Sequence, residues 1–136
     1  MDLVSRAQGI ILNPKKAWET IKSEDIQVKD LFTSYAMILA AIPAIANFIG
    51  LGLIGRNIPY VEGFYRYSLG WAFLSMILSY IFYLVFVLIV GFIINALAPT
   101  FGSTQDLNKA MALAVYSMTP FWLTGILYII PYNYIL

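Results

Sequence analysis

Few residues in this sequence are of a type that does chemistry. The chain contains no cysteine and no histidine, so it lacks a thiolate, the commonest metal ligand and the usual acid–base group near neutral pH. Ser103 and Lys109 share one predicted loop, but nothing completes a nucleophile–base–orienter set with them. Glu62 lies in another loop without a second acid beside it. The sequence therefore predicts no catalytic residue, no metal site and no cofactor, and we do not expect an enzyme.

A polar cavity inside a membrane is the other chemistry that the sequence could support. Five polar side chains lie in uncharged stretches and could line such a cavity: Asn47, Ser75, Ser79, Ser117 and Thr119. Helices broken at Pro43 and Pro120 could frame it. Ionisable groups within the membrane are the usual mark of ion and proton pathways, and these stretches carry none. A small transporter, channel or lipid-handling protein is therefore the alternative interpretation.

The elements that would position these residues are long apolar helices. Hydrophobic residues make up 61% of the 136-residue chain and charged residues 11%, whereas a soluble domain has about 25% charged residues. A helix of about 20 apolar residues crosses a bilayer core. Three stretches satisfy this requirement, at residues 31–55, 68–98 and 110–130. The sequence predicts an all-α polytopic membrane protein, a three-span helical bundle in which residues 31–136 form the transmembrane domain.

Residues 1–30 hold most of the charge and are predicted to form amphipathic helices at the cytoplasmic interface. Asn13 and Pro14 are typical of a helix start. In the helix that follows, Lys15, Lys16, Trp18 and Ile21 are expected to contact the membrane interface, because tryptophan prefers that region and lysine reaches lipid phosphates. The alternative is a cytosolic helical hairpin that packs on the ends of the spans.

Small residues are spaced for close packing of the spans. Lipid removes the hydrophobic force between helices, so small residues that let two backbones approach drive their association. The predicted packing residues are Ala36, Ala40, Ala44, Asn47 and Gly50 in the first span and Ala72, Ser75 and Ser79 in the second. Pro43 and Pro120 are predicted to kink the first and third spans.

The basic residues predict the orientation of the chain. Most of them fall on the N-terminal side of the predicted topology, namely Arg6, Lys15, Lys16, Lys22, Lys29 and Lys109, whereas Arg56 and Arg66 fall on the other side. The positive-inside rule then places the N-terminus in the cytoplasm and the C-terminus outside. The net charge of +1 argues against nucleic-acid binding driven by bulk charge.

Four short patterns resemble the Yip domain family, multi-span membrane proteins named for interaction with Ypt/Rab GTPases. The patterns are Gly9-Ile10-Ile11-x-Asn13-Pro14 followed by Ala17-Trp18 and Ile21, then Leu31-Phe32, Phe101-Gly102, and Ala114-x-Tyr116-Ser117-x-Thr119-Pro120. Together they cover nearly the whole chain, and none is a catalytic fingerprint. The resemblance implies no enzyme activity. The plain Asn-Pro opening is similar to prokaryotic members, so Rab binding is not carried over.

The resemblance also sets expectations for assembly. The family usually has more spans than the three predicted here, so either further spans follow in the native gene or a short member completes its bundle by oligomerisation. The leading interpretation is a non-catalytic scaffold or interaction protein, oligomeric or a subunit of a larger membrane assembly. Its expected partners are the lipid bilayer and a second copy or another membrane protein. The expected location is a bacterial or archaeal cytoplasmic membrane, or the Golgi or ER membrane if the source is eukaryotic.

Overall fold

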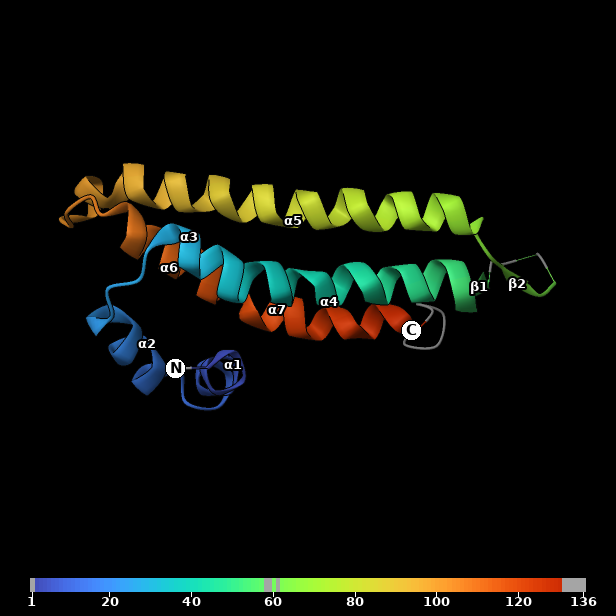
Figure 1. Ribbon diagram of the computed structural model, residues 1–136, viewed down its shortest axis with the longest axis horizontal. Coiled ribbons are helices and arrows are strands. Elements are labelled where there is room, and N and C mark those ends of the chain that lie inside the picture. The colour runs from blue at the N-terminus through green and yellow to red at the C-terminus, as the bar shows by residue number, and fades with distance from the viewer. Residues whose placement is uncertain (1, 58–59, 61, 131–136) are drawn as a thin grey trace. The chain divides into compact units, whose positions relative to one another are not determined.

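The computed structural model describes residues 2–57, 60 and 62–130 and is built almost entirely of helices (Figure 1). Three helical stretches are long and apolar enough to cross a membrane: Val28–Ile54, Leu69–Phe101 and Leu107–Ile129. Their bounds differ from the predicted ones by only a few residues. The predicted all-α, three-span membrane architecture is therefore confirmed.

The chain divides into two compact units by its internal contacts. The first unit comprises residues 1–39 and 84–120, and the second comprises residues 40–83 and 121–136. This division reflects contacts in space. The predicted boundary after residue 30 reflects position along the chain, and it stays a prediction.

The first unit begins with two short helices, α1 (Leu3–Leu12) and α2 (Pro14–Ser23). The Asp2 carboxylate accepts a hydrogen bond of 2.7 Å from the backbone N–H of Ser5 and caps α1. Pro14 occupies the first turn of α2, where its missing N–H costs nothing. After a short connection, α3 (Val28–Leu31), a π-helical turn η1 (Phe32–Ala36) and the start of α4 (Met37–Phe48) follow without a break.

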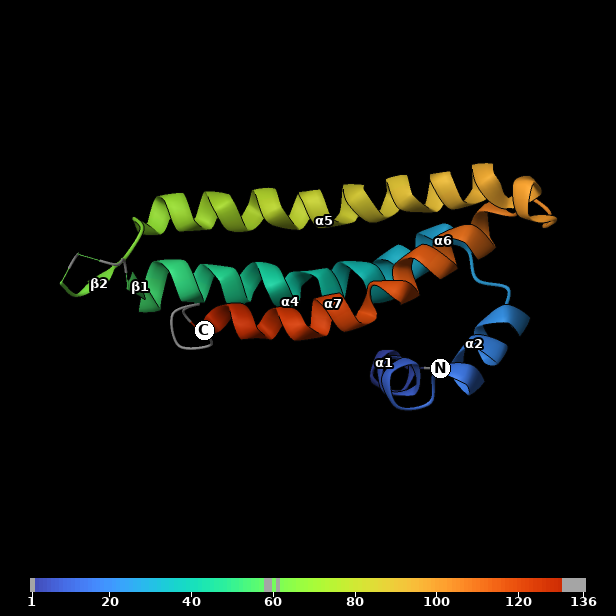
Figure 2. The same cartoon turned by 180° about the vertical axis from the view of Figure 1, so that it is seen from behind.

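The rest of the first unit comes from the second half of the chain. It contains the end of α5 (Leu69–Leu97), the 3-10 turn η3 (Ala98–Phe101), α6 (Leu107–Ser117) and the first residues of α7 (Thr119–Thr124). Gly102 adopts a left-handed conformation (φ 74°) that ends η3. The Asp106 carboxylate accepts a hydrogen bond from the N–H of Lys109 and caps α6. Both views show α3 beside α6 (Figures 1 and 2).

The core of the first unit is apolar and closely packed. Leu31, Leu39, Met111 and Val115 are all at most 2% exposed. Gly91 of α5 lies against the sulfur of Met111, and a side chain at this glycine would collide with that sulfur. The glycine therefore lets α5 and α6 approach closely.

The second unit contains the remainder of α4, the π-helical segment η2 (Ile49–Ile54), the first part of α5 and the 3-10 turn η4 (Gly125–Ile129). Two short strands, β1 (Arg56–Asn57) and β2 (Phe64–Tyr65), pair antiparallel between η2 and α5. The sequence predicted only a loop there. Such a pair of two-residue strands has no apolar alternation long enough to be predicted.

Glycines set the packing of the second unit. A side chain at Gly50 would collide with the backbone carbonyl of Tyr128, and one at Gly125 would collide with Pro43. Gly52 lies against the side chain of Ala72. Because these glycines have no side chain, backbone segments come together that any larger residue would separate.

The two prolines occupy different local structures. Pro43 is buried within a continuous α-helix, and the departures from α-helical geometry lie on either side of α4, in η1 and η2. Pro120 lies in the first turn of α7, directly after the turn at Met118 that separates α6 from α7. A proline there cannot donate to the Tyr116 carbonyl, which explains the interruption. The kinks themselves stay predictions.

Candidate binding site at the N-terminal hairpin

The side chain of Arg6 lies at the centre of a polar cluster in the first unit. Arg6 is only 4% exposed. Its Nη2 donates a hydrogen bond to Oε1 of Glu24, which forms an ion pair between α1 and the segment after α2. Its guanidinium carbon lies 5.2 Å from the ring centroid of Tyr116, a cation–π distance. The ion pair and the ring together allow a charged group to remain buried.

An aromatic contact extends this cluster into the helices of the unit. The rings of Tyr116 and Tyr35 meet edge to face, with centroids 4.8 Å apart. The hydroxyl of Tyr35 shares a buried hydrogen bond of 2.7 Å with Oγ1 of Thr119. Side chains from α1, η1, α6 and α7 are therefore connected in one contiguous set.

Two further bonds attach the segment after α2 to the start of α6. The ammonium group of Lys109 donates to the backbone carbonyls of Lys22, at 2.8 Å, and of Glu24. The backbone N–H of Val28 donates to Oδ1 of Asn108 at 3.2 Å. These bonds join residues that lie far apart in the sequence. They dock the N-terminal hairpin, defined as α1 and α2, against α6.

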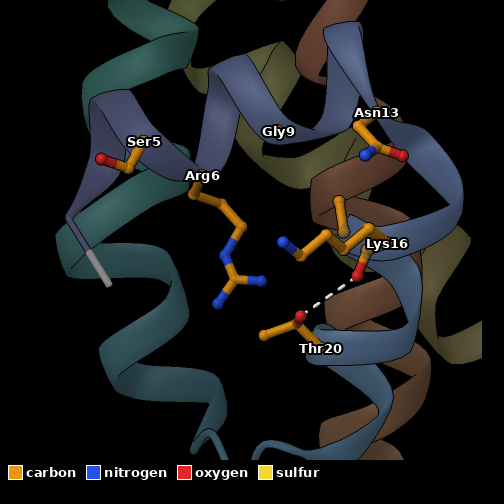
Figure 3. Close-up of a pocket in the computed structure, with 7 residues that line it drawn as sticks. Ser5, Arg6, Gly9, Asn13, Lys16 and Thr20 are labelled. Carbon is orange, nitrogen blue, oxygen red and sulfur yellow. Dashed lines mark hydrogen bonds between the residues drawn. The ribbon is translucent and has the colours of Figure 1, made fainter.

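A pocket of about 290 Å³ lies between the two helices of the hairpin. Figure 3 shows Arg6 reaching into it from α1 and Lys16 reaching toward Arg6 from α2. The hydroxyl of Thr20 donates to the backbone carbonyl of Lys16 at 3.0 Å. The remaining lining residues are Ser5, Gly9, Asn13 and Ala17. The cationic groups of this pocket are suited to holding an anion.

The predicted interface residues lie on α2 in different environments. Lys15 and Lys16 are exposed and Trp18 is half-buried, whereas Ile21 is only 5% exposed and packs inside the first unit. Membrane contact by these residues stays a prediction.

The predicted packing residues are mostly buried. Ala36, Ala40, Ala44, Gly50 and Ala72 are buried, and Asn47, Ser75 and Ser79 are half-buried.

Ser75 and Ser79 lie in an open hollow of about 520 Å³ along α5. The large exposed side chains of Trp71, Leu78 and Phe82 help to line it. We refer to this feature as the α5 hollow.

The five residues predicted for a polar cavity do not share one unit. Asn47, Ser75 and Ser79 belong to the second unit, and Ser117 and Thr119 belong to the first. Thr119 bonds to Tyr35, and the Ser79 hydroxyl donates to the carbonyl of Met76 in its own helix. Two of these hydroxyls are therefore already engaged in local hydrogen bonds.

Sequence reasoning missed Arg6, Glu24 and Tyr35 as a connected set. In the sequence, Arg6 and Glu24 are only two of the many charged residues of the N-terminal segment. The available indication was position, since Arg6 lies four residues before the buried Ile10 and so shares its helix face. In the part of the chain that the structure describes, no group of three acidic side chains could hold a metal ion.

Comparison with known proteins decides the family. The Yip1 domain family matches residues 9–136. The chain belongs to the Yip1 domain family. This match confirms the resemblance inferred from the sequence, and its range includes the second helix of the hairpin and all three spans of this Yip1 domain protein.

Two bacterial proteins are similar to this Yip1 domain chain. It is 29% identical over 131 residues to the inner membrane protein YohC of Escherichia coli K12, and equally similar to the YohC protein of E. coli O6:H1. The alignments cover 94% of this chain and 65% of each relative. The chain therefore spans just under two thirds of the length of these curated relatives. No solved structure matches it.

Proposed function

We propose that this Yip1 domain protein is a non-catalytic scaffold of a bacterial inner membrane that associates with a second copy of itself through α5. Membership of the Yip1 family and the similarity to E. coli inner membrane proteins support the location. The observation that carries the proposal is the exposure of α5. Only 11% of the residues in its apolar 18-residue window are buried, compared with 39% and 50% in the windows of the other two spans.

The α5 hollow supports a helix as the neighbour of this exposed surface. Lipid tails cover a smooth apolar face well, but small residues beside large ones offer a notch into which another helix backbone fits. Ser75 and Ser79 line the hollow together with the large, exposed side chains of Trp71 and Phe82. The buried alanines at positions 36, 40 and 44 are already used inside the chain.

The membrane orientation is part of this proposal, with the N-terminal hairpin in the cytoplasm. The contact of Lys109 with the end of α2 supports a common side for the hairpin and the loop before α6. Because the chain has no cysteine, single cysteines can be placed at Lys15 and at Glu62. A membrane-impermeant maleimide added outside should label the Glu62→Cys protein and leave the Lys15→Cys protein unlabelled.

The test of self-association is the mass of the assembly in mild detergent. Native mass spectrometry should show a dimer or a higher oligomer of the full chain. Ser79→Leu fills the α5 hollow and should shift the population toward monomer by about ten-fold, since one lost packing contact of about 1.4 kcal/mol changes the association constant by that factor.

Ala96→Leu is the matched control, because Ala96 is an exposed small residue of the same helix outside the hollow. This variant should keep the wild-type mass. The proposal is wrong if the wild-type protein is monomeric, or if Ser79→Leu and Ala96→Leu lose the oligomer equally.

A further inference from the structure

Arg6, which lines the pocket of the N-terminal hairpin, carries a buried nitrogen without a partner among the described residues. Nη1 of Arg6 is buried and has no hydrogen-bond acceptor among the described residues. The other terminal nitrogen, Nη2, is taken by Glu24, and the guanidinium also lies over Tyr116. A buried donor that belongs to a charged group is costly to leave unmatched. The structure therefore calls for an acceptor at Nη1.

The second cation of the pocket strengthens this requirement. Lys16 extends from α2 toward Arg6 in Figure 3. The residues that line the pocket include no carboxylate, and Glu24 is already paired with Arg6. Two positive groups directed at one space repel each other unless an anion lies between them. The missing acceptor is therefore expected to be negatively charged.

The size and donor geometry of the pocket select the class of anion. A volume of about 290 Å³ lies just below the range of drug-sized ligand pockets, which begins at about 300 Å³, so a small anion fits it best. One planar guanidinium and one ammonium group facing the same point are typical of phosphate recognition, because phosphate offers several acceptor oxygens to donors from different directions.

We infer that the N-terminal hairpin binds one phosphate group between Arg6 and Lys16. Nη1 of Arg6 donates to one phosphate oxygen, and the ammonium of Lys16 donates to another. The phosphate belongs to the headgroup of an anionic lipid or to a soluble phosphate, and both have the same recognition chemistry. Binding ties α1 to α2 through a group that neither helix supplies.

The substitution that tests this inference is Lys16→Gln. Arg6 also pairs with Glu24 and packs on Tyr116, so its replacement can disturb folding, whereas Lys16 is exposed and its loss leaves the core intact. Lys22→Gln is the matched control, since Lys22 is an exposed residue of α2 that does not line the pocket. Lys16→Arg keeps the charge and the donors.

Two measurements on the full chain in a phosphate-free, non-ionic detergent separate the two sources. Native mass spectrometry counts bound phosphatidylglycerol, with diacylglycerol as the phosphate-free lipid, and titration calorimetry follows inorganic phosphate. Lys16→Gln should weaken binding about ten-fold, as expected for one charged hydrogen bond. Lys22→Gln and Lys16→Arg should bind nearly as well as the wild type.

If only phosphatidylglycerol binds, with the expected order among the variants, the inference is supported and the phosphate belongs to a lipid headgroup. If only inorganic phosphate binds, with the same order, the inference is supported and the phosphate is soluble. Absence of binding by both probes, retention of diacylglycerol equal to that of phosphatidylglycerol, or equal losses of binding in Lys22→Gln and Lys16→Gln would overturn it. The oligomeric mass of the variants is expected to stay that of the wild type. Failure of phosphate binding and failure of self-association are therefore separate results.

Discussion

The two compact units of the chain differ in the polar contacts that stabilise them. To its apolar core and the close contact at Gly91, the first unit adds charged and polar bonds, such as the pair of Arg6 with Glu24 and the bond between Tyr35 and Thr119. The second unit uses glycines, such as Gly50 against the backbone at Tyr128. The difference follows from composition, because the first unit includes the charged N-terminal segment. Where few polar groups are available, close van der Waals contact must supply the stability.

The largest effect is expected from a side chain placed at a glycine contact of the second unit. Gly50→Val should lower the free energy of unfolding by about 3 kcal/mol, because the new atoms meet the backbone carbonyl of Tyr128, which cannot rotate away. Gly70→Val is the control, since nothing lies within 4 Å of a side chain at that position. Unfolding in detergent measures the loss of stability in both variants. Equal losses would show that glycine packing does not stabilise the unit.

In the first unit, the expected weak point is the ion pair. Glu24→Gln removes the charge that compensates Arg6 and should cost about 2 kcal/mol, less than for a fully buried pair because the Glu24 side chain is 26% exposed. Glu19→Gln changes an exposed acid of α2 and should have little effect. The same unfolding assay compares the two variants. If Glu24→Gln leaves the free energy of unfolding unchanged, water already screens the ion pair.

A smaller effect is expected from the buried hydroxyl pair. Tyr35→Phe and Thr119→Val should each cost about 1 kcal/mol, the usual value of a neutral hydrogen bond. Because both changes remove the same bond, the double variant should cost less than the sum of the two single variants. Strict additivity in this double-mutant cycle would mean that the 2.7 Å bond contributes nothing.

The smallest effect is expected at the cap of α1. The hydrogen bond from the Ser5 N–H lowers the pKa of the Asp2 carboxyl below its usual value of 3.8. The folded state therefore favours the ionised carboxylate. The cap stabilises α1 fully above pH 3.8, and this stabilisation is lost as the pH falls through the lowered pKa. Amide exchange in the first turn of α1 should be faster in Asp2→Ala at pH 6. The difference in exchange between the two proteins should shrink as the pH falls through the lowered pKa of Asp2.

The spans were predictable because they depend on a local property. The lengths of the apolar stretches predicted three helices whose bounds agree with Val28–Ile54, Leu69–Phe101 and Leu107–Ile129 to within a few residues. The Asn13-Pro14 helix start was readable for the same reason, since proline at the first turn is a local preference.

The candidate site was much less predictable because it depends on contacts between distant residues. The partners Tyr35 and Thr119 lie 84 residues apart in the chain, and no periodicity indicates which hydroxyl meets which ring. Lys16 was predicted to reach lipid phosphates, but its position opposite a buried Arg6 depends on how α1 and α2 fold against each other. The sequence supplied the residue types, and the structure supplied their arrangement.

Disulfide cross-linking in native membranes tests the central claim most directly, since the chain has no cysteine of its own. If copies meet along the α5 hollow, Ser79→Cys should form a disulfide-linked dimer on mild oxidation, and Ala96→Cys on the same helix should not. A Ser79→Cys protein that stays monomeric, or an Ala96→Cys protein that cross-links equally well or better, would contradict the account.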